Sequence, residues 1–339
     1  TNNGLTINSI SSIYFDYEGV LWVGTVGGGV NRIKNQKVIN YTTMDGLSDN
    51  LVWSIFQDKN DNILLATANN GVTEISKDKI KYITKKDGLP SDNIRIVFRD
   101  SKNRLWIGTY SSGLVLIDNN KKTIFDKKTG FLTTSIRAIY EDSKGRIWVS
   151  SNAKTYIYEN NKLQLFTTKD MPNSLHSRMI LEDKYGNIWF AAGGSGICKW
   201  DGKKVFNYTT KDGLSSNDVV SLYFDKDNTL WLATGNGLNR FKNNKFTKIN
   251  FNNIFDNHLL LYIIEDDYRN LWISSFIGLL AVNIDELNLY ADGKTNKINS
   301  VIIGKEHGML STECNGANQY AGLKSKDGRI WFPTYNGIS

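Results

Sequence analysis

Hydrophobic and polar positions follow one another in short runs that return regularly along the chain. Runs of six or seven residues rich in β-branched and aromatic side chains, such as Leu51–Gln57 and Ile136–Glu141, alternate with clusters of Gly, Asn, Asp and Lys. Such runs are typical of β-strands, and the clusters between them are typical of turns. No segment sustains the apolar period of an α-helix. The pattern therefore predicts an all-β protein.

One phrase recurs and fixes the period. It consists of Leu or Ile, an anchor residue that is Trp in seven of eight copies, and then small residues, as in "LWVGT" and "LWIGT". Neighbouring anchors are separated by 42, 42, 42, 41, 42, 41 and 59 residues. Self-similarity at this period is typical of four-stranded propeller blades. The anchors of copies 1 to 8 are Trp22, Leu64, Trp106, Trp148, Trp189, Trp231, Trp272 and Trp331.

Each copy divides into four predicted strands. The first strand ends at a turn, the second carries the anchor, a Gly-containing loop leads into the third, and a Lys- and Asn-rich turn leads into the fourth, typified by "VINYT" and "VFNYT". An aspartate six residues before the anchor marks the first turn, because Asp side chains bond to nearby backbone groups. We interpret these residues as turn formers rather than catalytic acids. They are Asp16, Asp58, Asp100, Asp142, Asp183, Asp225 and Asp266.

The predicted fold is a β-propeller of seven or eight four-stranded blades, with eight repeats counted in the sequence. The repeat covers residues 1–339, so we expect a single propeller domain. The long last interval, from Leu280 to Asn315, holds either extra strands or a loop that covers one face. Because the chain begins and ends inside repeat phrases, we expect it to belong to a longer protein.

Composition changes this picture little. The net charge is +7, but the lysines concentrate in turns and form no single stripe, so no nucleic-acid partner is predicted. Cys198 and Cys314 provide neither a disulfide framework nor a zinc motif, and we expect both to be unpaired. No apolar run is long enough to span a membrane. No cofactor or metal is predicted.

A candidate site lies in one column of the repeat. In propellers generally, the first strand of each blade lines the central channel, and ligands usually meet the channel at the rim formed by the four-to-one and two-to-three loops. Near the rim end of the first strand, eleven residues before the anchor, three consecutive copies carry arginine: Arg95, Arg137 and Arg178. Guanidinium groups bind carboxylate, sulfate or phosphate. The sequence therefore predicts an anionic subsite.

Aromatic residues and a histidine complete the predicted site. The same column and the rim loops offer flat faces for stacking, and His176 lies two residues from Arg178. In the alternative interpretation, each arginine pairs with an aspartate or a carbonyl of a neighbouring blade and the rim histidines are simply solvated. No catalytic carboxylate pair or Ser/His/Asp order is present, so an enzyme is not predicted. The predicted stacking residues are Trp53, Tyr320, Tyr110, Phe276 and Tyr335.

The repeat phrases resemble a known family. "DGLSDNLVWSIFQDKNDNILLATANNGV" (Asp45–Val72) and "DGLPSDNIRIVFRDSKNRLWIGTYSSGL" (Asp87–Leu114) are similar to the two-component regulator propeller repeat. The segment His307–Ser339 resembles the last repeat of such sensor regions, which precedes a β-sandwich and a membrane helix.

The resemblance implies a non-catalytic ligand sensor. In that family, propellers form the extracytoplasmic sensing portion of histidine kinases, hybrid two-component proteins and diguanylate cyclases. The resemblance implies a small molecule or a carbohydrate as the ligand, and the arginine column indicates that this ligand is anionic. A homodimer of the full-length sensor stays open, and membrane attachment would come only from segments outside this chain. Such sensors often hold two propellers in tandem, of which this would be the later.

Two other functions stay open at this point. Seven-bladed streptogramin lyases carry phrases similar to "GNIWF" at Gly186–Phe190, and a lyase would need a rim histidine, His176 or His258, beside a metal-holding carboxylate. The closing repeat from His307 onward favours the sensor. A platform for protein interaction or dimerisation is the third interpretation.

Overall fold

The computed structural model of the chain describes residues 6–7, 9–15, 21–33, 38–77, 79–131, 135–172, 175–251 and 255–339. The chain separates into two compact units, Thr1–Ile39 and Asn40–Ser339. The prediction of one domain over residues 1–339 is therefore corrected: the first three strands of copy 1 form a unit of their own.

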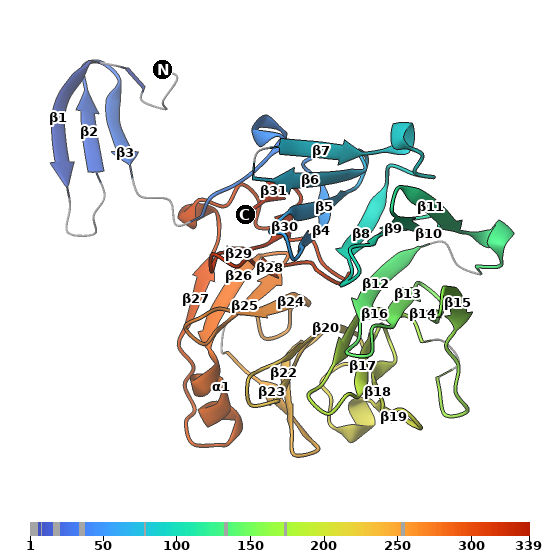
Figure 1. Ribbon diagram of the computed structural model, residues 1–339. Helices are drawn as coiled ribbons and strands as arrows, with labels where there is room; N and C mark the ends of the chain where they lie inside the picture. The colour runs from blue at the N-terminus through green and yellow to red at the C-terminus, as the bar shows by residue number, and fades with distance from the viewer. Residues whose placement is uncertain are drawn as a thin grey trace. The chain divides into compact units, whose positions relative to one another are not determined.

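The larger unit is built from sheets of four antiparallel strands, one for each of copies 2 to 7, in the part of the chain that the structure describes. In each sheet the strands pair in chain order (Figure 1). The first three sheets contain β4 (Val52–Gln57), β5 (Ile63–Thr67), β6 (Val72–Ser76) and β7 (Lys79–Ile83); β8 (Ile94–Arg99), β9 (Leu105–Thr109), β10 (Leu114–Asp118) and β11 (Lys121–Phe125); and β12 (Ile136–Glu141), β13 (Ile147–Ser151), β14 (Thr155–Glu159) and β15 (Lys162–Leu165).

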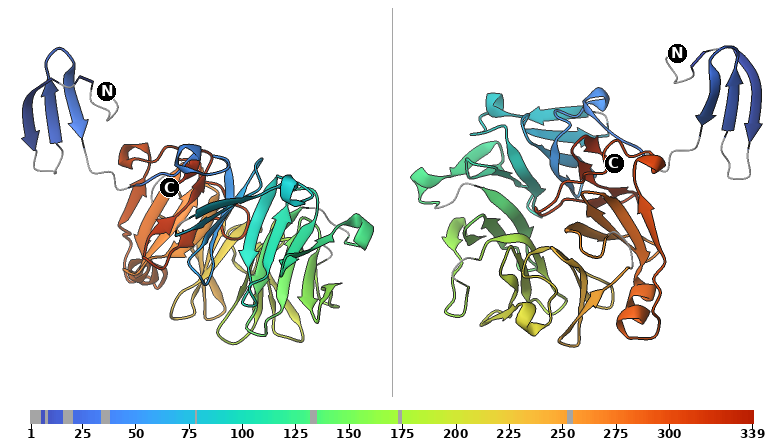
Figure 2. Two further views of the ribbon diagram at one scale, coloured as in Figure 1. Left: turned by 45° about the horizontal axis from the view of Figure 1, so that its top comes forward. Right: turned by 180° about the vertical axis from the view of Figure 1, so that it is seen from behind.

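The next three sheets continue around the ring, which is seen obliquely in the left view of Figure 2. They contain β16 (Ser177–Glu182), β17 (Ile188–Ala192), β18 (Gly196–Trp200) and β19 (Val205–Tyr208); β20 (Val219–Phe224), β21 (Leu230–Thr234), β22 (Gly237–Lys242) and β23 (Lys245–Ile249); and β24 (Leu260–Glu265), β25 (Asn270–Ser275), β26 (Gly278–Asn283) and β27 (Ser300–Ile303). The long interval after β26 holds a short helix, α1 (Ile284–Ala291), rather than extra strands.

Copy 8 forms the last blade together with a strand from the start of the unit. It contributes β28 (Leu323–Lys324), β29 (Ile330–Trp331), β30 (Pro333–Thr334) and β31 (Gly337–Ile338). Tyr41, from the "VINYT" phrase of copy 1, then pairs with Ile338 through two backbone hydrogen bonds of 2.9 and 3.0 Å. Copy 1 thus gives its fourth strand to the blade of copy 8, and this exchange closes the ring.

The first strands contact one another in a closed cycle, β4, β8, β12, β16, β20, β24, β28 and back to β4. They lie around the centre of the ring (Figure 1). The described part of the larger unit is therefore a propeller of seven blades, which is the lower of the two predicted counts.

The recurrent Asp and Trp have a shared structural role. In copies 3 to 7 one carboxylate oxygen of the aspartate accepts a hydrogen bond from the anchor indole, as from Trp148 to Asp142 at 2.8 Å. The other oxygen accepts from backbone amides of the turn. The interpretation of these residues as turn formers is confirmed for the described copies, while Asp16 lies outside the described residues.

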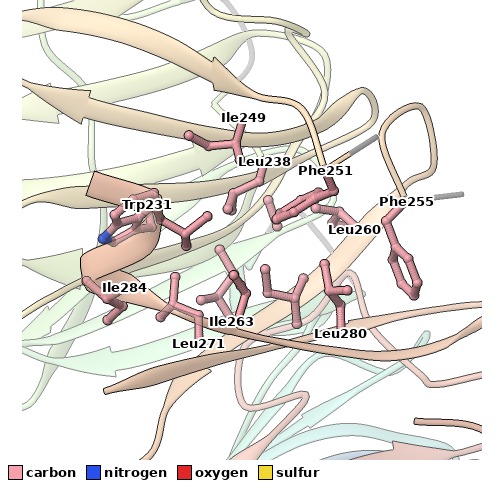
Figure 3. Close-up of a cluster of buried hydrophobic side chains, with 14 residues drawn as sticks. Trp231, Leu238, Ile249, Phe251, Phe255, Leu260, Ile263, Leu271, Leu280 and Ile284 are labelled. Atoms are coloured by element: carbon pink, nitrogen blue, oxygen red, sulfur yellow. The ribbon is translucent and has the colours of Figure 1, made fainter. Parts of the chain in front are cut away.

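The core lies between neighbouring blades. One cluster joins the sheets of copies 6 and 7 and includes Trp231, Leu238, Leu260 and Ile263 (Figure 3). Fully burying a side chain of this size contributes about 1.5–3 kcal/mol, so each seam stabilises both sheets that form it. Cys198 and Cys314 are buried and free, as predicted.

The smaller unit is a three-stranded sheet of β1 (Ile10–Phe15), β2 (Leu21–Thr25) and β3 (Gly29–Ile33). Val23 is buried in it, but several of its other apolar side chains are exposed. Ile13 is 61% exposed, whereas the equivalent Ile139 of copy 4 is fully buried.

Candidate functional site

The arginine column lies at the channel end where the first strands begin. Arg95, Arg137 and Arg178 are each at the second residue of their strand, on β8, β12 and β16. These strands belong to consecutive blades and contact one another in pairs. Each arginine influences the protonation of its neighbours: the charge of Arg137 acts on Arg95 and that of Arg178 acts on Arg137. The structure therefore brings the three predicted residues to one mouth of the channel.

Arg95 lies between two aromatic rings. Its guanidinium carbon is 5.6 Å from the ring centre of Trp53 and 4.8 Å from that of Tyr110, which are distances of cation–π contact. Nη1 donates to Ser135 Oγ at 3.0 Å. Burial, and next the charge of Arg137, lower the pKa of Arg95 to about 10, so it stays charged at neutral pH. Trp53 and Tyr110, two of the predicted stacking residues, therefore lie against Arg95.

Arg137 is held less tightly. Its Nη1 donates to the backbone oxygen of Ala317 across a long 3.4 Å. Burial and then the charge of Arg178 lower the pKa of Arg137. Because each charge disfavours the other, an anion placed between these arginines would relieve the repulsion.

Arg178 has an acidic partner. Its Nη1 lies 2.8 Å from Oδ1 of Asp218, which precedes β20 in the next blade. His176 is also at this mouth, and burial, then the charges of Arg178 and Arg137, lower the pKa of its imidazole. His176 is therefore neutral at pH 7. In the alternative interpretation, each arginine pairs with an aspartate or a carbonyl of a neighbouring blade. Arg178 has such a partner in Asp218, Arg137 has only the long bond to the carbonyl of Ala317, and the partner of Arg95 is a hydroxyl.

Several buried donors at this mouth have no hydrogen-bond partner among the described residues. They are the Nε atoms of Arg95 and Arg137 and the Nε1 of Trp53. A buried donor left without a partner costs free energy, about 1–3 kcal/mol. Two of these donors belong to the charged guanidinium groups of Arg95 and Arg137 themselves, and together with the indole of Trp53 they suit an oxyanion, which accepts through several oxygens at once.

Tyr320 lies elsewhere, and its prediction as a stacking residue at the arginine mouth is corrected. Its ring stacks on Phe98 at 5.7 Å and meets Phe56 edge-on at 5.2 Å, at the far ends of the first strands. The reason is that copy 8 does not begin its first strand at the expected residue. Gln319 instead bonds to the backbone of Arg137 and Ile180, on two other blades.

The segment 314–322 therefore fills part of the channel, and we call it the channel segment. Its anchoring bonds reach the first strands of copies 2, 4 and 5: the amide of Ile55 donates to the oxygen of Tyr320, and the side chain of Asn315 donates to the oxygen of Val52. Ala317 and Tyr320 have φ angles of 60° and 64°, which residues with a Cβ seldom adopt. The long interval thus holds a segment that enters the channel, besides α1.

The two other predicted stacking residues, Phe276 and Tyr335, lie on the loops of copies 7 and 8 at the same repeat position as Tyr110. Each is 45% exposed. They face the mouth from blades that carry no arginine in the column, and no contact joins them to Arg95, Arg137 or Arg178 among the described residues. Sequence reasoning missed Asp218 and Ser135, although both stand thirteen residues before their anchors.

Among the residues that the structure describes, no three or more His, Cys, Asp or Glu side chains gather as a cation would require. His258 is exposed, and His307 contacts Glu306 at 2.9 Å. No helix of this part of the chain combines the length and hydrophobicity needed to cross a bilayer.

Comparison with solved structures yields propellers. The extracellular domain of a B. thetaiotaomicron protein described as a hybrid two component system superposes with a TM-score of 0.80 at 24% identity, over 100% of this chain and 46% of that one. The extracellular domain of a B. thetaiotaomicron protein described as a one component system gives 0.71 at 19% identity, over 99% and 47%. The chain therefore spans less than half of either.

A virginiamycin B lyase from Staphylococcus aureus is also similar, with a TM-score of 0.65 at 15% identity, over 88% of this chain and 96% of the lyase. At such identities these structures support the fold, which is the predicted β-propeller. No curated protein matches the sequence.

The sequence model of the two component regulator propeller matches residues 4–27, 46–69, 88–111, 130–153 and 213–236. These segments fall in copies 1, 2, 3, 4 and 6, and each contains the turn aspartate and the anchor. These five segments therefore match the repeat of the two component regulator propeller family, as the phrases predict.

Proposed function

We propose that this chain is the ligand-binding part of a sensor in a membrane signal-transduction protein, located outside the cytoplasm, and that it has no catalytic activity of its own. The similarity to extracellular domains of two component and one component system proteins supports this proposal. A ligand bound to such a sensor acts by its differential affinity for two signalling states.

The ligand of this proposal is a small anionic molecule, such as an acidic oligosaccharide, bound at the arginine mouth. The observation that carries it is the excess of unpaired donors there. Arg95 and Arg137 have no carboxylate partner among the described residues, and the burial of Arg95 and partial burial of Arg137 weaken the screening of their charges by solvent. Trp53 and Tyr110 add flat faces beside Arg95.

The surroundings of His176 favour the sensor over the lyase alternative. A metal-dependent lyase would place a cation beside His176. That histidine has two arginines as neighbours, and Asp218 is already paired with Arg178. Positive charges this close oppose the binding of a metal cation.

A thermal-shift experiment with acidic and neutral oligosaccharides tests the proposal. A ligand at 100 times its dissociation constant stabilises the folded state by about 2.7 kcal/mol. We expect acidic compounds to raise the melting temperature of the wild type and to lose this effect in the Arg95→Ala/Arg137→Ala/Arg178→Ala variant. Arg329→Ala, whose side chain is 58% exposed, is the control. A rise with neutral sugars alone, or an unchanged response of the triple variant, would overturn the role of the arginines.

A further inference from the structure

The repeat provides a second column that faces the arginines. In copies 1 to 6 the residue thirteen positions before the anchor lies just ahead of the first strand, and its backbone oxygen accepts from the loop after the second strand of its own repeat, as Asp218 does from Gly235 at 2.8 Å. In copies 4, 5 and 6 this column contains Ser135, His176 and Asp218. Ser135 and Asp218 contact the arginine of the preceding blade, and His176 lies near enough to Arg178 and Arg137 for both charges to act on it.

The three pairs differ in charge. Arg95 donates to the neutral hydroxyl of Ser135 at 3.0 Å. Arg137 acts on His176, whose pKa burial and the two nearby arginines lower. Only the third pair of this column includes a carboxylate, with Arg178 Nη1 2.8 Å from Asp218 Oδ1. The mouth is thus strongly positive between copies 3 and 4 and close to neutral between copies 5 and 6.

Two glycines leave room for the neutral pair. Gly193 and Gly235 occupy the loop position that holds Tyr110 in copy 3. A Cβ on Gly193 would lie 2.9 Å from His176 Nε2 and 3.2 Å from Arg178 Nε. Neither glycine has a left-handed φ, so the backbone itself does not require glycine there. Because Gly193 and Gly235 have no side chains, Arg178 and Asp218 can pack directly against the backbone of these loops.

We propose that Asp218 determines the specificity of this mouth. It restricts the ligand to one anionic group, bound by Arg95 and Arg137, with a neutral hydroxyl-bearing part that lies over the Arg178–Asp218 pair. This inference rests on the proposed function, because it assigns the parts of the same site.

The chemistry of the pair supports this division. Arg178 keeps donors that Asp218 does not use, and Asp218 keeps an acceptor oxygen, so together they match hydroxyl groups, which both donate and accept. A second anionic group over the pair would meet the carboxylate of Asp218 at short range, where like charges repel. The pair lies where β16 and β20 are neighbours in the ring (Figure 1).

Calorimetric titration with three compounds of the same carbon number tests the proposal. D-glucose has no anionic group, D-glucuronate has one and D-glucarate has two. We expect the wild type to bind D-glucuronate more tightly than the other two. Asp218→Asn frees Arg178 for a second carboxylate, so the affinity for D-glucarate relative to D-glucuronate should rise about fivefold or more, since a released charge pair is worth about 1 kcal/mol.

Two matched variants separate this effect from a general change in charge. Asp118→Asn makes the same charge change at an exposed residue at the end of β10 and should leave the ratio unchanged. Asp218→Glu keeps the carboxylate and should keep the ratio near that of the wild type. A fold check by melting temperature accompanies each variant.

The outcomes distinguish the two proposals. If D-glucuronate binds and Arg95→Ala weakens it, but Asp218→Asn leaves the ratio unchanged, the specificity role of Asp218 is wrong and the anion site stands. If neither acid binds the wild type more tightly than D-glucose does, the anion site is wrong, and the role of Asp218 falls with it.

Discussion

Two halves of the same channel mouth use one repeat position in opposite ways. Eleven residues before the anchor, copies 3 to 5 have arginine, whereas copies 6 and 7 have Val220 and Leu261, which are 2% and 1% exposed. The strands that carry these residues have the same length and the same pairing register with their neighbours. The backbone therefore does not decide which half is polar.

The channel segment accounts for the difference. A Cβ on Gly316 would lie 2.5 Å from Leu261 Cβ, so the segment packs closely on the apolar half. On the arginine half it makes the long contact between Ala317 and Arg137. The channel segment thus covers the apolar half of the mouth, which we call the sealed half. The arginine half keeps charged donors without partners among the described residues. A position of the repeat is therefore open to a ligand in those blades where no other part of the chain packs against it.

The largest expected effect comes from placing a charge in the sealed half. Leu261→Arg puts a guanidinium group against Gly316, at a position where the native side chain is 1% exposed. A buried, unpaired charge of this kind should lower the free energy of unfolding by about 3 kcal/mol or more. Urea denaturation measures it. A variant as stable as the wild type would mean that the channel segment does not pack on this strand in solution.

The reverse exchange should affect binding and not stability. Arg137→Leu gives copy 4 the residue that copy 7 has and removes a buried charge repelled by its neighbours. We expect the free energy of unfolding to stay within about 1 kcal/mol of the wild type or to rise. The affinity for inorganic selenate should fall about tenfold, which corresponds to about 1.4 kcal/mol. A large loss of stability would show that Arg137 is a structural residue.

A smaller effect should come from pH. A bound anion favours the protonated form of His176, whose pKa burial, Arg178 and Arg137 lower while Asp218 opposes them. Binding therefore takes up a proton, and selenate affinity should rise a few-fold as the pH falls from about 7 to about 5. His176→Gln should remove this rise. An equal rise in the variant would assign the proton to another group.

Those site residues whose position depends only on their own repeat could be predicted from the sequence. The distance from the anchor placed Arg95, Arg137 and Arg178, because the offset within a blade is constant. Asp218 was missed since its contact crosses from one blade to the next, and that offset depends on how the sheets pack. Tyr320 was misplaced because the first strand of copy 8 begins only at Leu323, so Tyr320 lies in the channel segment that precedes it.

The pairing of the fourth strand of copy 1 with the blade of copy 8 could not be predicted for a similar reason. The phrase around Tyr41 in copy 1 is nearly the same as that around Tyr208 in copy 5. Tyr208 pairs with Ile197 of its own sheet, and Tyr41 makes the equivalent pair with Ile338 of copy 8. Local sequence specifies a fourth strand, but not the sheet that it joins.

The most direct test of the central claim is the position of a bound anion. Crystals of the chain soaked in selenate, with diffraction data collected at the selenium absorption edge, would locate the anion by its anomalous signal. The account predicts a peak between the guanidinium groups of Arg95 and Arg137, absent in crystals of the Arg137→Leu variant. Peaks only at surface lysines, or a peak that persists unchanged in the variant, would contradict it.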